Sequence, residues 1–258
     1  MRRTLATLLL CALAAPAEAA SLAEVQACMQ KNAPTTALVQ TVALVSTDRA
    51  GGERKYEVQL MAKRLESGLG RVLVRVEAPA DVRGTAFLVI QNEGGRSDMY
   101  VYLPELKKVR RITSRTLQGK FLGSDFAYED LERLLSASRQ SDARLGADAE
   151  KEGRKVWTIE ATPTADAGSA YTRITSSVDQ ETCVPLEIAF YEKGEAPAKV
   201  LSVDPARVTQ EGAVHVPRIV RMRDVEGGTE SRLETLAVEL DPELKDVIFS
   251  RGALDKGR

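Results

Sequence analysis

The sequence predicts a mainly β protein of antiparallel strands with a few helices. Apolar and polar residues alternate in several segments, most clearly at residues 55–63 and 71–77, and glycines mark short turns between such segments. A period of two places one face of each strand on a core, and short turns join neighbouring antiparallel strands. We therefore expect about eleven strands and two or three helices. One domain over residues 20–258 is expected, because all-β domains commonly reach ~200–250 residues.

Residues 1–19 have the pattern of a secretory signal peptide. Two arginines precede an apolar run at residues 5–15, and the small residues of Ala-Glu-Ala follow at 17–19. The run is shorter than the ~20 residues needed to cross a bilayer, and no later stretch is long enough either. We expect cleavage after Ala19, a periplasmic location and a mature protein that is not transmembrane. Cys11 follows Leu10, where lipidation needs a small residue, so a lipid anchor is disfavoured.

Three segments predict helical structure. Ser21 and Glu24 form a capping box in front of an apolar stripe at residues 22–29. In the middle of the chain Gly123 breaks the backbone, and residues 124–135 combine acids at the start with an apolar face, so a short helix capped by Ser124 or Asp125 is expected there. Residues 242–249 are expected to form a last helical turn.

Two of the expected strands are apolar on both faces, at residues 87–90 and 99–103. Such strands need cover on both sides. They predict either a central strand under a packed helix or the lining of an apolar cavity, and both hold if a helix covers the sheet. The remaining strands are expected at residues 156–159, 171–178, 186–191, 198–208, 218–224 and 231–240.

Two cysteines, Cys28 and Cys183, remain after cleavage. An oxidising compartment allows them to pair, which predicts a disulfide between the first helix and a distant strand. Two separately buried thiols are the alternative.

The residues that carry catalysis or metal binding are scarce. His215 is the one histidine, and nucleotide-binding, zinc-protease and nucleophile-elbow motifs do not occur. Asp125, Glu129 and Asp130 have the composition of a glycosidase pair, but helix capping explains them better. We therefore expect no enzyme, no metal and no cofactor. The net charge of −1 also argues against a nucleic-acid binder.

A basic run follows the strand at 99–103 and contains Lys107, Lys108, Arg110 and Arg111. It is interpreted as a solvated strand face, as a network with Asp125 and Asp130, or as a docking patch for an acidic partner or an anionic lipid head group.

Two neighbouring motifs resemble a known family. Residues 98–112, DMYVYLPELKKVRRI, are similar to the D-M-W-V-Y-L-P-x-L-x-K-V-R-R-I segment of LolA-like outer-membrane lipoprotein-sorting proteins. Residues 119–131, GKFLGSDFAYEDL, are similar to that group's G-S-F-x-G-S-D-F-x-Y-E-D-L, and residues 83–88 resemble the strand before it. The closer part of the resemblance covers about residues 83–135.

The resemblance implies a curved, incomplete antiparallel barrel covered by lid helices, with acyl chains carried in the apolar hollow. It implies a carrier of lipoprotein or lipid acyl chains toward the outer membrane, working with an inner-membrane transporter and an outer-membrane acceptor. An adaptor subunit of an envelope lipid exporter is the alternative, and a periplasmic hydrolase is a third. The expected cavity lining is Phe87, Val89, Met99, Val101, Leu103, Phe121, Phe126 and Leu131.

Overall fold

The computed structural model describes residues 20–33, 35–93, 96–135 and 141–256, so the predicted signal peptide and Cys11 lie outside the described residues. The described residues form sixteen strands and two α-helices, α1 (Leu22–Gln30) and α2 (Tyr128–Leu135). The strands are β1 (Ala37–Thr47), β2 (Glu53–Arg64), β3 (Gly70–Ala78), β4 (Ala86–Ile90), β5 (Asp98–Leu103), β6 (Lys108–Arg111), β7 (Ser141–Leu145), β8 (Ala149–Lys151), β9 (Arg154–Pro163), β10 (Arg173–Asp179), β11 (Pro185–Tyr191), β12 (Lys199–Val203), β13 (Val208–Glu211), β14 (Val214–Pro217), β15 (Ile219–Asp224) and β16 (Thr229–Leu240).

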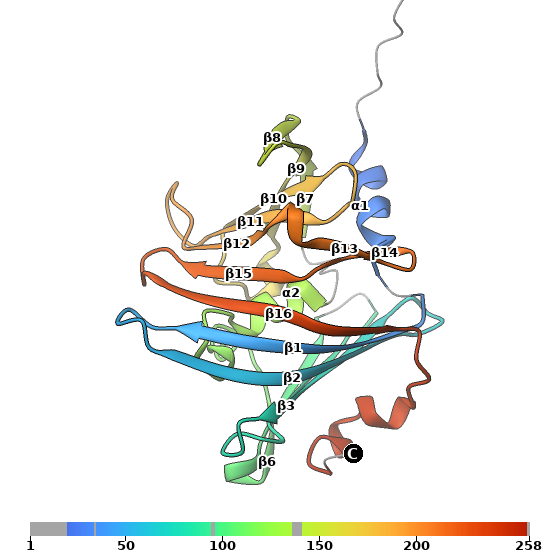
Figure 1. The fold of residues 1–258 in the computed structure, drawn as a ribbon, viewed down its shortest axis with the longest axis vertical. Coiled ribbons are helices and arrows are strands. Elements are labelled where there is room, and N and C mark those ends of the chain that lie inside the picture. Colours follow the sequence, from blue (N-terminus) through green and yellow to red (C-terminus); the bar gives the residue numbers. More distant parts are fainter. Residues whose placement is uncertain (1–19, 34, 94–95, 136–140, 257–258) are drawn as a thin grey trace, which may run out of the picture.

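Fourteen of these strands form one antiparallel sheet, and β13 and β14 form a separate hairpin. The order is β6-β5-β4-β3-β2-β1-β16-β15-β12-β11-β10-β9-β7, with β8 paired to β9. The first and the last strand, β1 and β16, therefore pair with each other in the middle of the sheet. Figure 1 shows that the sheet is curved and that α2 lies inside the curve. The predicted fold class, a curved open antiparallel sheet with few helices, is confirmed.

Alternation along the strands gives the sheet two apolar faces. On β3, Val72, Val74 and Val76 belong to the cluster on the inner face of the curve, and Leu73 belongs to a second cluster on the outer face. The inner cluster extends over strands from both halves of the sheet, from Val101 on β5 to Ile174 on β10. A period of two therefore places one continuous apolar surface inside the curve.

The outer face is covered at one place by the C-terminal residues. Two short 3₁₀ helices, η5 (Asp246–Phe249) and η6 (Arg251–Ala253), follow β16, and η5 packs against β3. Phe249 and Leu254 are fully buried in the outer cluster. The helical turn predicted at residues 242–249 is present as η5.

The first helix has the predicted capping box and disulfide. The Ser21 amide donates to Glu24 Oε2 at 2.7 Å, and the Glu24 amide donates to Ser21 Oγ at 3.3 Å. Cys28 is bonded to Cys183, with their Cα atoms 5.5 Å apart. Cys183 lies in the turn between β10 and β11 rather than inside a strand. The disulfide therefore ties α1 to one end of the sheet.

The strand count exceeds the expected eleven for local reasons. β1 was not recognised because its apolar residues do not alternate strictly: Val42, Leu44 and the adjacent Val45 are all buried. The single strand expected at residues 198–208 is divided into β12 and β13 by a 3₁₀ turn, Pro205–Arg207, that begins at Asp204.

Candidate ligand-binding site

The candidate site is the inner face of the sheet together with residues 117–135, which we call the inserted segment. All eight residues expected to line a cavity lie in or against one apolar cluster there. Leu103 is half-buried, and the other seven are at most 7% exposed. They come from three places: Phe87, Val89, Met99, Val101 and Leu103 from β4 and β5, Phe121 and Phe126 from the loop before α2, and Leu131 from α2.

A tight loop directs two phenylalanines of the inserted segment toward the sheet. The Phe121 amide donates to the Phe126 carbonyl at 2.8 Å, so the chain reverses between them. Leu122 and Gly123 at the tip have φ values of 52° and 71°. Glycine adopts that region without strain, whereas for leucine it is unfavourable by about 1–2 kcal/mol. The Tyr56 hydroxyl donates to the Leu122 carbonyl at 3.0 Å and fixes this loop on β2.

Three aromatic rings fill the space between the loop and β4. The Phe87 ring lies 5.4 Å from the Tyr128 ring and 6.2 Å from the Phe121 ring, centroid to centroid. These distances are typical of aromatic pairs that stabilise a core beyond the area they bury. The inserted segment is therefore packed into the inner face and does not merely lie over it.

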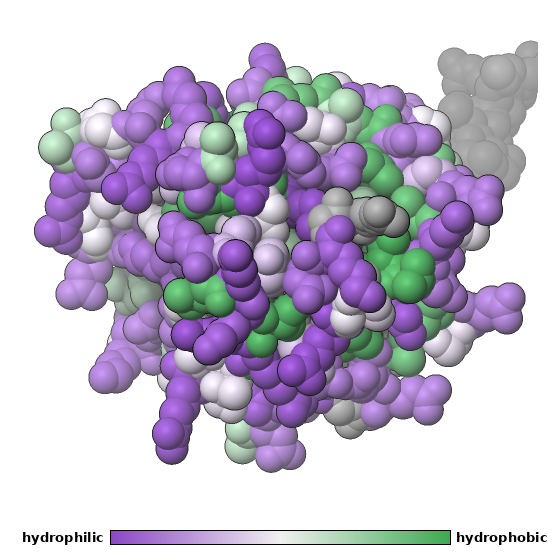
Figure 2. Space-filling view, turned by 90° about the horizontal axis from the view of Figure 1, so that it is seen from below, coloured by the Kyte–Doolittle hydropathy of each residue, from purple (hydrophilic) through white to green (hydrophobic). Residues whose placement is uncertain are grey.

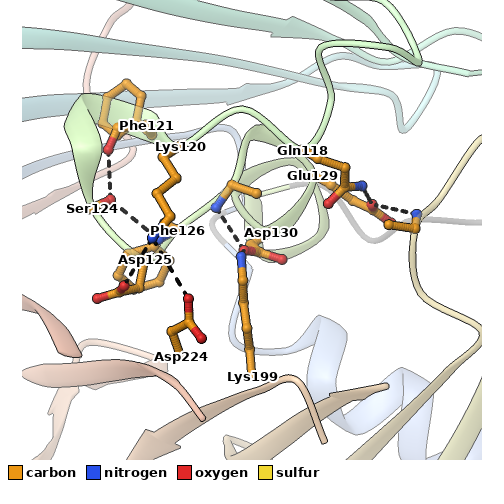
Figure 3. A network of polar contacts seen from close by, with 12 residues as sticks. Gln118, Lys120, Phe121, Ser124, Asp125, Phe126, Glu129, Asp130, Lys199 and Asp224 are labelled. Carbon is orange, nitrogen blue, oxygen red and sulfur yellow. Dashed lines mark hydrogen bonds and ion pairs between the residues drawn. The ribbon is translucent and has the colours of Figure 1, made fainter. Parts of the chain in front are cut away.

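Asp125 connects the inserted segment to β16. Its side chain is 2% exposed and accepts hydrogen bonds from Thr229 Oγ1 at 2.6 Å and from Ser231 Oγ at 2.7 Å. The Asp125 amide donates to Ser231 Oγ at 2.9 Å. Lys120 Nζ lies 3.6 Å from Asp125 Oδ1 and 3.7 Å from Asp224 Oδ2, as Figure 3 shows. A buried carboxylate needs such partners to remain charged.

Asp130 connects α2 to the other half of the sheet. It is fully buried and accepts hydrogen bonds from Tyr171 Oη at 2.6 Å and from Lys199 Nζ at 3.0 Å. Its second role is local, since the Ala127 amide donates to Asp130 Oδ2 at 2.7 Å at the start of α2. Burial, with the charge of Asp130, raises the pKa of Tyr171 far above its ordinary value. The hydroxyl therefore keeps its proton and acts as the donor.

Glu129 connects α2 to the segment before β10. It is 3% exposed and accepts hydrogen bonds from Gln118, from Ser169 and from Arg133, whose Nη2 lies 2.9 Å from Glu129 Oε1. With Asp125 and Asp130 it forms a set of three buried carboxylates, which we call the acidic anchors. Each anchor fixes the inserted segment to a different part of the chain. Figure 3 shows one of these contacts, between Asp130 and Lys199.

Two expectations about these acids need correction. Asp125 and Ser124 do not cap α2, because the helix begins three residues after Asp125 and the Asp125 side chain bonds β16 instead. The arginines are not brought together with the acids. Arg110 and Arg111 are exposed on β6, and Arg111 pairs with Asp98, whereas Asp125 and Asp130 pair with Lys120 and Lys199.

The partners of the acidic anchors were not identified from the sequence. Tyr171, Lys199 and Ser231 lie 41, 69 and 106 residues away from the anchors they bond. Lys199 gave a weak signal, as a lysine at the start of an otherwise apolar strand. Tyr171 and Ser231 carry no sequence pattern that singles them out.

A small pocket beside α2 has a volume of about 20 Å³. This volume suits one water molecule. The pocket is lined by Arg96, Ser97, Met99, Leu117, Glu129, Glu132, Arg133 and Ala167. The pocket therefore contacts the apolar cluster through Met99 and Leu117, and its remaining lining includes the charged side chains of Arg96, Glu129, Glu132 and Arg133.

Two statements about metal sites and membrane spans hold for the described residues alone. Within residues 20–256, apart from the gaps given above, three or more histidine, cysteine or acidic side chains nowhere gather as a metal site would require. In the same part of the chain, none of the helices has the length and apolar character that crossing a membrane would require.

The curved open sheet with an apolar inner face covered by an inserted helix defines a LolA-like fold, and comparison with solved structures confirms this fold. A structure described as an outer membrane lipoprotein-sorting protein domain, from Vibrio parahaemolyticus, matches with a TM-score of 0.82 and 26% identity over 91% of this chain and 98% of that chain. A DUF1329 family protein from Desulfovibrio piger matches with a TM-score of 0.81 and 23% identity, over 89% and 95% of the two chains. A LolA superfamily protein from Nitrosomonas europaea matches with a TM-score of 0.71 and 20% identity, over 90% of this chain and 98% of that chain.

A family model with the description "Uncharacterized protein" matches residues 68–256, and the chain belongs to that family. The matched region contains both motifs on which the resemblance rests and all three acidic anchors. No curated protein matches the chain.

Proposed function

We propose that this protein is a non-enzymatic periplasmic carrier that shelters acyl chains of a lipoprotein or lipid on the inner face of its sheet and moves them toward the outer membrane. The observation that carries the proposal is the continuous apolar surface under the inserted segment, which joins Phe87 on β4 to Phe190 on β11. Sheltering an acyl chain from water is favourable by roughly 0.8 kcal/mol for each CH₂ group. The likeness to a lipoprotein-sorting domain supports the same function.

Loading requires the inserted segment to move, because its apolar side chains already cover the inner face of the sheet. Phe121, Phe126 and Leu131 already stand on the inner face as apolar groups. An entering acyl chain that displaces these side chains replaces their apolar contacts with its own. The hydrophobic contribution to the free energy therefore differs little between the closed and the loaded state. The acidic anchors then set most of the free-energy difference between the closed and loaded states.

Transfer in this proposal needs partners and no cofactor. An inner-membrane transporter supplies the acyl chain and an outer-membrane acceptor with a better-fitting site removes it. Arg110 and Arg111 are exposed on β6, which is an edge strand of the sheet, and are the proposed docking residues for an acidic surface.

The test uses an uncharged fluorescent monoacylglycerol and two matched variants. Phe126 and Phe249 are both fully buried, the first on the inner face and the second on the outer face. Replacing Phe126 with alanine enlarges the proposed site, so we expect tighter probe binding, whereas Phe249→Ala should bind the probe as the wild type does. Equal binding by the two variants, or no binding to folded wild-type protein, contradicts the carrier proposal.

The closed interior also favours a second candidate, an adaptor subunit of an envelope lipid exporter that binds no lipid itself. Native mass spectrometry of protein taken from the periplasm separates the two. Co-purified lipid supports the carrier, and lipid-free protein that still co-purifies with an exporter supports the adaptor.

A further inference from the structure

Arg75 on β3 is a buried guanidinium whose end has no protein partner. It is 8% exposed, and its Nη1 and Nη2 atoms are buried without a hydrogen-bond partner among the described residues. Alternation places it on the outer face with Leu73, and it is paired in register with Ala86, which belongs to the outer cluster. Arg75 therefore lies on the opposite side of the sheet from the inserted segment.

Such a group is unfavourable unless something compensates its charge. Arginine remains charged in proteins, and an unpaired buried charge is strongly destabilising. Burial lowers the pKa of Arg75, and the charge of Glu77 opposes that effect without an ion pair between them. Arg71, four residues earlier on the same face, also has a buried Nε atom without a hydrogen-bond partner in the described chain. The outer face thus presents donors that need an acceptor.

The C-terminal residues cover this part of the outer face and are attached by few polar contacts. Lys63 Nζ donates to the Leu244 carbonyl at 2.7 Å and pairs with Asp246 Oδ1 at 2.6 Å. The Arg251 guanidinium lies 5.8 Å from the centre of the Tyr100 ring. Figure 2 shows the molecule from the side on which the C-terminal residues lie in Figure 1, and its hydrophobic groups are small and separated by polar ones. Phe249 and Leu254 of this cover share the outer cluster with Ala86, the register partner of Arg75.

We propose that Arg75 anchors an anion-binding site on the outer face, beneath the C-terminal residues, that takes a phosphate or carboxylate group. The planar guanidinium offers two parallel N–H groups, which match the two oxygens of such an anion. Arg71 lies on the same face of the strand, where its positive charge also acts on the Asp246 carboxylate of the C-terminal cover. The site is separate from the inner face, so it binds independently of any acyl chain.

The experiment measures thermal unfolding of the purified protein in chloride buffer at constant ionic strength. The probes are inorganic phosphate, acetate, and vesicles of phosphatidylglycerol with phosphatidylcholine vesicles as the neutral comparison. A ligand that binds only the folded state raises Tm. We expect phosphate, acetate or the anionic vesicles to raise Tm in the wild type, and the arm that responds identifies a free anion or a lipid head group.

Two variants make the test specific. Arg75→Met keeps the apolar stem and removes the unpaired charge, so we expect a higher Tm in anion-free buffer and no further rise with any anion. Arg64→Gln removes an exposed arginine from the neighbouring strand β2 and should respond as the wild type does. In a ¹H–¹⁵N spectrum the Arg75 Nε–H signal should shift on binding.

An equal rise of Tm in Arg75→Met and wild type overturns the proposal, because the anion then binds elsewhere. Failure of every anion to raise the wild-type Tm or shift the Arg75 signal also overturns it, since water alone would then satisfy the guanidinium. Neither result bears on the carrier proposal, whose probe is uncharged and whose site lies on the inner face.

Discussion

Replacing Asp130 with asparagine tests whether a buried ion pair holds the inserted segment on the sheet. The Asp130 side chain is fully buried, and Lys199, whose side chain is 11% exposed, donates to it at 3.0 Å. Asparagine keeps the shape and removes the charge, which leaves the ammonium of Lys199 without a counter-charge. Removing one partner of a buried pair destabilises proteins by about 3–5 kcal/mol.

The expected loss is in the lower half of that range. The asparagine carbonyl can still accept from Tyr171 or from the Ala127 amide, which now bond the carboxylate at 2.6 and 2.7 Å. We therefore expect Asp130→Asn to lower the free energy of unfolding by about 3 kcal/mol. Urea unfolding followed by fluorescence of the single tryptophan, Trp157, measures this loss as a lower midpoint at an unchanged slope.

A second variant and a control complete the test. Adding Lys199→Met to Asp130→Asn removes the unpaired ammonium and should restore at least about 1–2 kcal/mol. Glu160→Gln breaks a more exposed pair with Arg144, in which the Arg144 side chain is 77% exposed, and should cost less than about 1 kcal/mol. A loss below about 1 kcal/mol for Asp130→Asn, or no recovery in the double variant, would refute the argument that this pair is an anchor.

Two further predictions concern the sheet end that α1 covers. Replacing Cys28 and Cys183 with serine opens a loop of sequence separation 155. The loop-entropy model gives a loss of up to about 5 kcal/mol in the free energy of unfolding, so the variant should have a lower thermal midpoint than the disulfide form. An unchanged midpoint would contradict this prediction. Burial alone would raise the pKa of Asp179, but hydrogen bonds from Arg154 and Thr182 outweigh it and hold that pKa below the ordinary 3.8. The stability it adds is present above pH 3.8 and is lost as the pH falls through the lowered value. In the Asp179→Asn variant the free energy of unfolding should therefore fall less steeply below pH 4 than in the wild type. An equally steep fall in the two proteins would count against this role of Asp179.

The sequence predicted those strands whose alternation is regular. Residues 71–77 alternate between apolar and charged residues at every position except Leu73, and they form β3 with valines on the inner face. Regularity fails in β1, where Val42, Leu44 and the adjacent Val45 are all buried, so that strand was not recognised. The division of residues 198–208 depends on the turn that begins at Asp204, which a preference for β-branched residues does not reveal.

The candidate site was predictable in its apolar part alone. Phe87 and Val101 share a face because period two fixes the direction of each side chain, so a local pattern was enough. The acidic anchors were interpreted as helix caps, since near a helix start an acid has a local explanation. Asp125 and Asp130 also have partners on strands far along the chain, such as Ser231 for Asp125, and no local pattern reports such pairing. Asp130 keeps a local role as well, since it accepts a hydrogen bond from the Ala127 amide at the start of α2.

The pairing of β1 with β16 determines when the sheet can be completed. Leu38 lies opposite Leu240, so the central ladder joins two strands that are far apart along the chain. Contacts of such long sequence separation form slowly, because a large loop must close before they contribute. The two halves of the curved sheet consequently stay unjoined until both of these strands have been made. For a chain expected to be exported before it folds, this order of assembly delays premature closure during passage through the membrane.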